Sequence, residues 1–144
     1  MPTAPTHQPG HPAATHRLTE IGLRALYELH HQRYLDYAHL LLGPTDAHLA
    51  LRASFEYLTE SRSDILGTAN PAEHIWQAVR QRIHLLAGPR PLQPVAHLKP
   101  ALQDAVLLHL ALGYPVTDVA AMTGTEPAHV HARLRTLGAQ ATQR

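Results

Sequence analysis

Histidine is unusually frequent in this chain, with 13 residues among 144, whereas cysteine is absent. The absence of cysteine excludes disulfides, cysteine-based zinc sites, iron–sulfur clusters and thiol catalysis. His7 and His11 have the H-x-x-x-H spacing of helical metal sites, but they lie in a Pro- and Gly-rich segment that fixes no ligand geometry. Within the predicted helices no two histidines are three or four residues apart, so we expect neither a metal site nor a cofactor.

The side chains that could act in catalysis are few. The only serines are Ser54, Ser61 and Ser63, and none lies in a nucleophile-elbow motif. The sequence contains no Gly-rich phosphate-binding loop and no paired-carboxylate motif. His30 and His109 fall on apolar helix faces, which favours hydrogen-bonded positions in the core. We therefore expect that the protein is not an enzyme.

The most informative spacing lies between Val119 and Val130. A small residue, Ala120, is followed four residues later by Gly124 and six residues after that by Val130. In a helix-turn-helix the small residue lets two helices cross closely, the glycine adopts the left-handed turn conformation, and the apolar residue packs the second helix on the first. The same offsets occur in other helical hairpins, so this motif alone leaves the function open.

Apolar residues recur every three or four residues from Thr19 onward, and no alternating strand pattern appears, so the predicted fold class is all-α. Residues 1–17 are rich in proline and are predicted to be a disordered tail. A first helical module of three helices is predicted over 18–87 and a second over 98–144, joined by a Pro-rich linker over 88–97. Asn70, Pro71 and Glu73 form a strong helix start, and further helices are predicted from Pro100 to Gly113, from Val116 to Thr123 and from about Thr125.

Residues 92–138 resemble region four of RNA polymerase sigma factors. Leu98, Gln103 and Val106 precede the helix-turn-helix in the family's order, and the module ends with Val130-His131-Ala132-Arg133-Leu134 at the family's spacing. Leu23 to Glu28, Tyr37 to Gly43 and Asn70 to Arg82 are similar to the helices of sigma region two, through hydrophobic spacing. Two such modules without a region three are typical of extracytoplasmic-function sigma factors.

This resemblance implies a transcription-initiation protein of the cytoplasm that binds core RNA polymerase and promoter DNA, with an anti-sigma-type regulator as a further partner. Thr125 would lie near phosphate at a helix N-terminus, Arg133 and Arg135 would contact phosphate, and Glu126 or His129 would reach base edges. Ala128 and Ala132 would share that exposed face. Arg80 and Arg82 would contact the downstream promoter strands, and Trp76 would either stack on a base or, as we favour, pack in the core.

The surface that faces polymerase in this family departs from the usual acidic pattern. Of that pattern only Asp46 remains, while His48, Leu49 and Arg52 replace its other positions. Charge also argues for weak promoter binding, because the net charge is only +1: residues 1–88 carry −1 and residues 89–144 carry +2. An alternative is therefore a degenerate sigma-like adaptor that acts through a protein partner with little promoter recognition. A helix-turn-helix of the LuxR kind is a third interpretation, but its spacing after Val130 fits less well.

The first residues contain no apolar core of a signal peptide, and no apolar run approaches the length of a membrane span. We therefore expect a cytoplasmic location.

Overall fold

Every regular element is helical in the part of the chain that the structure describes. This computed structural model describes residues 12–89 and 94–142, with side chains described between 22 and 138. The elements are α1 (Pro12–Leu41), α2 (Pro44–Glu60), α3 (Arg62–Leu66), α4 (Pro71–Ala87), α5 (Pro100–Ala105), the π-helix η3 (Val106–Ala111), α6 (Val116–Thr123) and α7 (Pro127–Thr142). None of the helices in these ranges is both long enough and apolar enough to cross a membrane.

The helix boundaries that depend on local capping agree with the sequence. The Asn70 side chain accepts a hydrogen bond from the backbone N–H of Glu73 at 3.2 Å, and Pro71 is the first residue of α4. Pro44 is likewise the first residue of α2, directly after Gly43, but no side chain caps this helix. Proline suits this position because its missing N–H would have no partner in the first turn of a helix. The predicted all-α class is confirmed.

Three local features differ from the sequence-based expectation. Helix α1 begins at Pro12, inside the predicted tail, and residues 1–11 of that tail lie outside the described range. Ala13 and Ala14 favour helix strongly, so a helix nucleated further along the chain extends back to this proline. A short helix, α3, follows Ser61, so the module for which three helices were predicted contains four. The predicted helix from Pro100 changes to π geometry after Ala105, with backbone bonds that span five residues.

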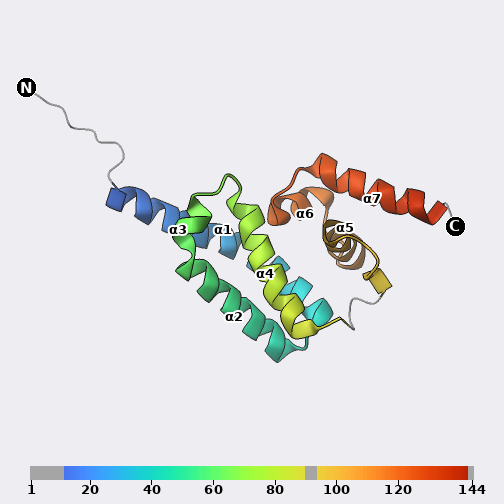
Figure 1. Ribbon diagram of the computed structural model, residues 1–144, viewed down its shortest axis with the longest axis horizontal. Coiled ribbons are helices and arrows are strands. Elements are labelled where there is room, and N and C mark those ends of the chain that lie inside the picture. The colour runs from blue at the N-terminus through green and yellow to red at the C-terminus, as the bar shows by residue number, and fades with distance from the viewer. Residues whose placement is uncertain (1–11, 90–93, 143–144) are drawn as a thin grey trace, which may run out of the picture.

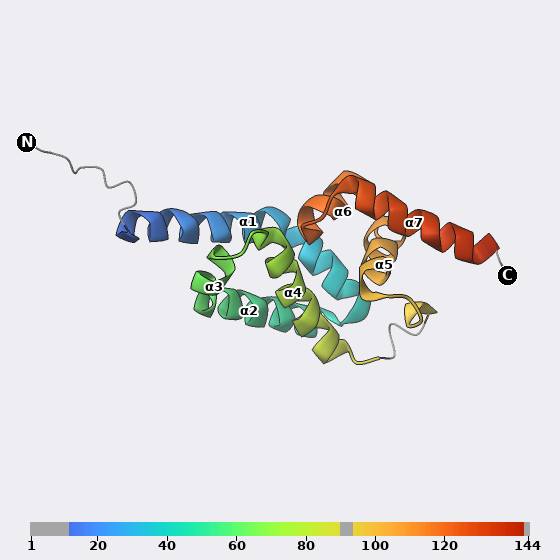
Figure 2. The same cartoon turned by 45° about the horizontal axis from the view of Figure 1, so that its top comes forward.

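The helices α1, α2 and α4 pack together, and α6 contacts α4 while α7 contacts α5 (Figure 1). The first turns of α1 and the last turns of α7 extend beyond the packed helices at opposite ends of the molecule (Figure 2). The stripe predicted for α1 is buried at Leu23, Tyr27, Tyr34, Tyr37 and Leu41. Trp76 is only 1% exposed, so its predicted place in the core is confirmed.

The buried residues of both halves of the chain form one continuous apolar cluster. It contains Tyr37 of α1 and Trp76 of α4 together with Leu108, Val119 and Met122 from the second half. The contact between the two halves, which we call the seam, is therefore a protein interior that buries large side chains from both halves. Of the predicted linker, residues 90–93 lie outside the described range, while Gln103 of α5 donates to the carbonyl of Val95 at 3.0 Å.

Candidate nucleic-acid interface

The helices α6 and α7 are joined by a tight turn at Gly124, where the spacing of Ala120, Gly124 and Val130 predicts a helix-turn-helix. Gly124 ends α6 with φ 76° and ψ 33°, the left-handed conformation that glycine adopts without a Cβ penalty. The backbone N–H groups of Gly124 and Thr125 both donate to the carbonyl of Ala120, at 3.0 and 2.9 Å. Ala120 is 2% exposed and Val130 is 1% exposed, so the two helices cross over buried small and apolar side chains.

The face of α7 that sequence analysis assigned to DNA is only partly open. Arg133 and Thr125 are half-buried, at the seam with α4. The exposed members of the predicted set are Glu126, Ala128, His129, Ala132 and Arg135. The two alanines leave room for close approach of a ligand surface, and Arg135 supplies an exposed cation. This exposed face is the part of α7 suited to a phosphate backbone or a groove edge.

The turn of the helix-turn-helix rests on the N-terminus of α4. The Asn70 side chain donates from Nδ2 to the carbonyl of Gly124 at 2.6 Å. A Cβ placed on Gly124 would lie 2.3 Å from the backbone nitrogen of Glu73 and 2.6 Å from its Cα. Position 124 therefore requires glycine for two reasons. Its backbone is left-handed, and it lies in direct contact with the backbone of α4.

A carboxylate on α5 joins the two halves in the interior. Asp104 is 5% exposed, and Arg80 of α4 donates from Nε to its two oxygens at 2.8 and 2.9 Å. Trp76 donates from its indole nitrogen at 3.0 Å, and the Tyr37 hydroxyl donates at 3.0 Å. Each lone-pair direction of the carboxylate is thus used, which is what burial of a charge requires. We call these four residues the Asp104 network.

Burial raises the pKa of Asp104 above its ordinary value, and the Arg80 charge together with the hydrogen bonds acts in the opposite direction. His84 extends the network, since its Nε2 lies 2.7 Å from the Tyr37 hydroxyl. The single hydroxyl proton of Tyr37 goes to Asp104, so His84 donates to the Tyr37 oxygen from Nε2. Burial first, and then the Arg80 charge, lowers the pKa of His84 to about 4.

A second polar bridge connects α1 to the loop before α6 and to α6 itself. The Tyr114 hydroxyl donates to Asp36 of α1, and burial together with this bond raises the pKa of Tyr114 to about 12. Arg33 pairs with Asp118 of α6 at 3.4 Å and lies over the Tyr114 ring at 5.8 Å. His109 contacts the carbonyl of Tyr114 through Nδ1 at 2.8 Å, as expected for a hydrogen-bonded histidine.

The two arginines of α4 that were predicted to contact promoter strands have partners within the protein. Arg80 has a side chain that is 14% exposed, and it also donates to Gln103 at 2.9 Å. The guanidinium carbon of Arg82 lies 4.0 Å from the centre of the Tyr57 ring, and Nη1 donates to the carbonyl of Ala78. A DNA contact by Arg80 would require the Asp104 network to open, whereas Arg82 would have to leave its ring stack and its hydrogen bond to the Ala78 carbonyl.

The predicted partner-binding residues on α2 are all exposed, and the C-terminal half does not cover them. The exposed residues are Asp46, His48, Leu49 and Arg52. His48 packs edge-on against His39 with ring centroids 6.1 Å apart. No group of three or more histidines, aspartates or glutamates that could hold a metal ion is found among the described residues.

Sequence reasoning missed the Asp104 network. Its one local sign is a lone acidic residue inside the apolar stretch from Leu98 to Leu112. The partners of Asp104 lie 24 to 67 residues away along the chain, so no spacing rule connects them.

The sequence matches no protein-family model, and no curated protein or solved structure matches the chain. Function is therefore inferred from the residues and their geometry.

Proposed function

We propose that this chain is a sigma-factor-like protein of transcription initiation or regulation that binds DNA through α6 and α7. In this proposal the exposed face of α7 contacts DNA, and the helices α1, α2 and α4 carry the surface for core RNA polymerase or a protein in its place. A cytoplasmic location and an anti-sigma-type regulator are part of the same proposal.

The observation that carries the proposal is the turn at Gly124. A left-handed glycine between two helices of eight and sixteen residues, with Ala120 and Val130 buried at the crossing, is the geometry of DNA-reading helix-turn-helix units. The second helix of such a unit enters the major groove with its N-terminal residues toward the bases. In α7 these are Ala128 and His129, which are both exposed.

Charge sets the expected strength of this binding. Affinity for DNA comes largely from cations that neutralise phosphates, with a slope of about −0.9 in log affinity against log salt per contact. Of the arginines on α7, Arg135 is exposed and Arg133 is half-buried. We therefore propose weak binding by the protein alone and stronger binding when a partner adds contacts.

The test is selection of bound sequences from random duplex DNA by the full chain at low salt, followed by affinity measurement on the enriched duplex. Arg135→Ala and His129→Ala should weaken binding to the enriched sequence, whereas Arg24→Ala on α1 should not. Enrichment of no sequence, or equal effects of all three variants, would contradict a DNA-reading role for α7.

The second candidate function is an adaptor that retains the fold and acts through a protein partner. The engagement of Arg80 with Asp104 favours it, because that arginine is withdrawn from solvent. Pull-down with core polymerase and run-off transcription separate the two candidates, since an adaptor shows no association at low salt. Acidic substitutions at His48, Leu49 and Arg52 together should create polymerase affinity if the replaced surface is what prevents it.

A further inference from the structure

We propose that the groove between α1 and α2 is a docking site for an acidic amphipathic helix of a partner protein. The groove has an apolar floor and a basic rim, and none of its residues belongs to α6 or α7. From α1 it is lined by Leu23, Arg24, Tyr27, Glu28 and His31, and from α2 and the start of α3 by His48, Leu51, Arg52, Phe55, Leu58, Thr59 and Arg62.

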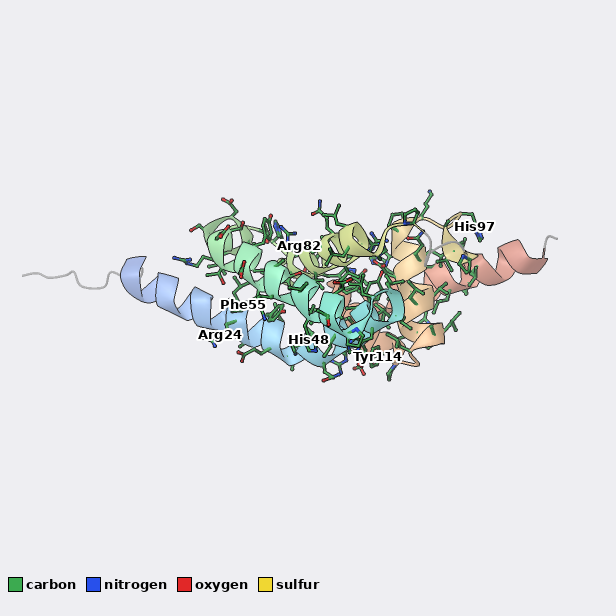
Figure 3. All side chains as sticks on the ribbon, turned by 90° about the horizontal axis from the view of Figure 1, so that it is seen from below. Arg24, His48, Phe55, Arg82, His97 and Tyr114 are labelled. Atoms are coloured by element: carbon green, nitrogen blue, oxygen red, sulfur yellow. The ribbon has the colours of Figure 1, made fainter. Side chains whose placement is uncertain are left out.

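The groove is long enough for a helix. It consists of two hollows of about 320 and 470 Å³ that share Arg24, Tyr27 and Phe55, so one continues into the other. Arg24, Phe55 and His48 follow one another along the line between α1 and α2 (Figure 3). The lining on α2 runs from His48 to Thr59, which at 1.5 Å per residue is roughly 17 Å, or about three helical turns.

Apolar side chains form the floor of the groove along this length. Tyr27 and Phe55 pack with ring centroids 5.2 Å apart, and Leu58 closes the floor beneath them. A helix with apolar residues at positions i, i+3 or i+4, and i+7 presents the matching stripe.

The charge on the rim of the groove determines which charge is favoured on the partner. Among the described side chains that line the groove, three are arginines and one, Glu28, is acidic, so their formal charge is +2 with His31 and His48 neutral. The whole chain carries only +1, which means that positive charge is concentrated here. An apolar helix flanked by Glu or Asp complements this rim, whereas one flanked by Lys or Arg is repelled.

Two of the three rim arginines, Arg24 and Arg52, are exposed to such a partner, whereas Arg62 is half-buried and donates to the carbonyl of Thr59. Arg24 pairs with Glu28 at 3.1 Å, but their side chains are 69% and 61% exposed, so exchange of Glu28 for a partner carboxylate costs little. Arg52 is exposed and has no ion-pair or hydrogen-bond partner among the described residues. His48 and Arg52, two of the four residues assigned to partner binding from the sequence, lie on this rim, while Asp46 and Leu49 do not line it.

The test uses the full chain and two fluorescent helical peptides with the same leucine stripe, one flanked by glutamate and one by lysine. Fluorescence anisotropy should show the glutamate peptide binding at least about tenfold more tightly, which corresponds to about 1.4 kcal/mol. Arg24→Glu with Arg52→Glu should reverse that preference. Thr59→Trp, which fills the groove mouth without changing charge, should weaken the glutamate peptide by a similar factor.

Arg135→Glu is the control for a single rim substitution such as Arg52→Glu, because it makes the same charge change as each of the two rim substitutions, at an exposed site on α7, and should leave the peptide affinity unchanged. Circular dichroism establishes that each variant is folded. Equal binding of the two peptides, or binding unaffected by Thr59→Trp, overturns the proposal. Self-association of the chain that Thr59→Trp abolishes also overturns it, since the occupant is then a second copy. Loss of DNA binding in the α7 variants would not change the peptide-binding result. The groove proposal and the proposed DNA-binding function can therefore be refuted independently.

Discussion

Substitution of Gly124 by alanine tests whether the helix-turn-helix is fixed to α4 as described. The new Cβ would meet the Glu73 nitrogen at 2.3 Å, its Cα at 2.6 Å and its Cβ at 2.7 Å. Two of these atoms are backbone, so side-chain rotation cannot relieve the overlap. Gly113 is the matched control, since it has φ +79° against +76° for Gly124 but nothing within 4 Å of an added Cβ.

The expected cost follows from two separate contributions. A non-glycine residue in left-handed backbone costs about 1 kcal/mol, and this applies to both positions. At Gly124 the overlap adds about 1–3 kcal/mol. Displacement of Glu73 also breaks the Asn70 bond to the Gly124 carbonyl, which is worth about 1 kcal/mol. Gly113→Ala should therefore lose about 1 kcal/mol of unfolding free energy, and Gly124→Ala about 3–5 kcal/mol.

Chemical denaturation followed by the fluorescence of Trp76, the only tryptophan in the chain, measures both variants. Its indole nitrogen donates to Asp104, so the signal reports the seam itself. At about 3–5 °C of Tm per kcal/mol for a chain of this size, the two variants should differ by roughly 10 °C. Equal destabilisation by Gly113→Ala and Gly124→Ala would refute the contact between Gly124 and α4.

Three further predictions concern charge. Asp104→Asn removes the partner of a buried guanidinium and should cost about 3 kcal/mol in urea unfolding, because Arg80 keeps its charge in the interior; a loss below about 1 kcal/mol would contradict the network. The pKa of His84 falls from 6.5 to about 4 on folding, so its stabilising effect is complete above about pH 6.5 and is lost as the pH falls toward 4. For a fully buried His84 this pH-dependent change in the free energy of unfolding would be about 3 kcal/mol, and the partial exposure of its side chain reduces it to about 1–2 kcal/mol. His84→Gln, which keeps a donor, should flatten the stability–pH curve by that amount, and a parallel curve would refute the assignment. Arg135→Ala should lower the salt slope of DNA binding by about 1, with Arg24→Ala as an unchanged control; no change in slope would mean that Arg135 contacts no phosphate.

Elements with strong local signals could be predicted closely from the sequence. Asn70 and Pro71 define the start of α4, and α6 has the bounds expected from Val116 and Gly124. These signals depend on capping and backbone conformation within a few residues, which the sequence displays directly. The exposed face of α7 follows for the same reason, since helical periodicity separates Ala128 and Ala132 from Val130.

Features that arise from packing between distant segments could not be predicted. Asp104 is a polar residue on a short amphipathic helix, and only the approach of α1 and α4 makes it a buried acceptor. The sequence around Arg80 is the same whether its side chain contacts DNA or an internal carboxylate. Arg133 is half-buried in a hollow that residues of α4 and α5 also line, which no pattern within α7 indicates. The roles in DNA and partner binding stay predictions.

Because the two halves share one apolar cluster, the connection between α4 and α5 does not have to fix their relative orientation. Orientation is set by the Asp104 ion pair and the contact at Gly124, both formed outside that connection. The connection is therefore a covalent tether between two halves whose orienting contacts lie elsewhere, and Gln103 bonds to Val95 near its end. The two halves thus associate through their mutual contacts, as two separate proteins would, while remaining covalently joined. Lengthening the tether should weaken their association only gradually and leave its geometry intact.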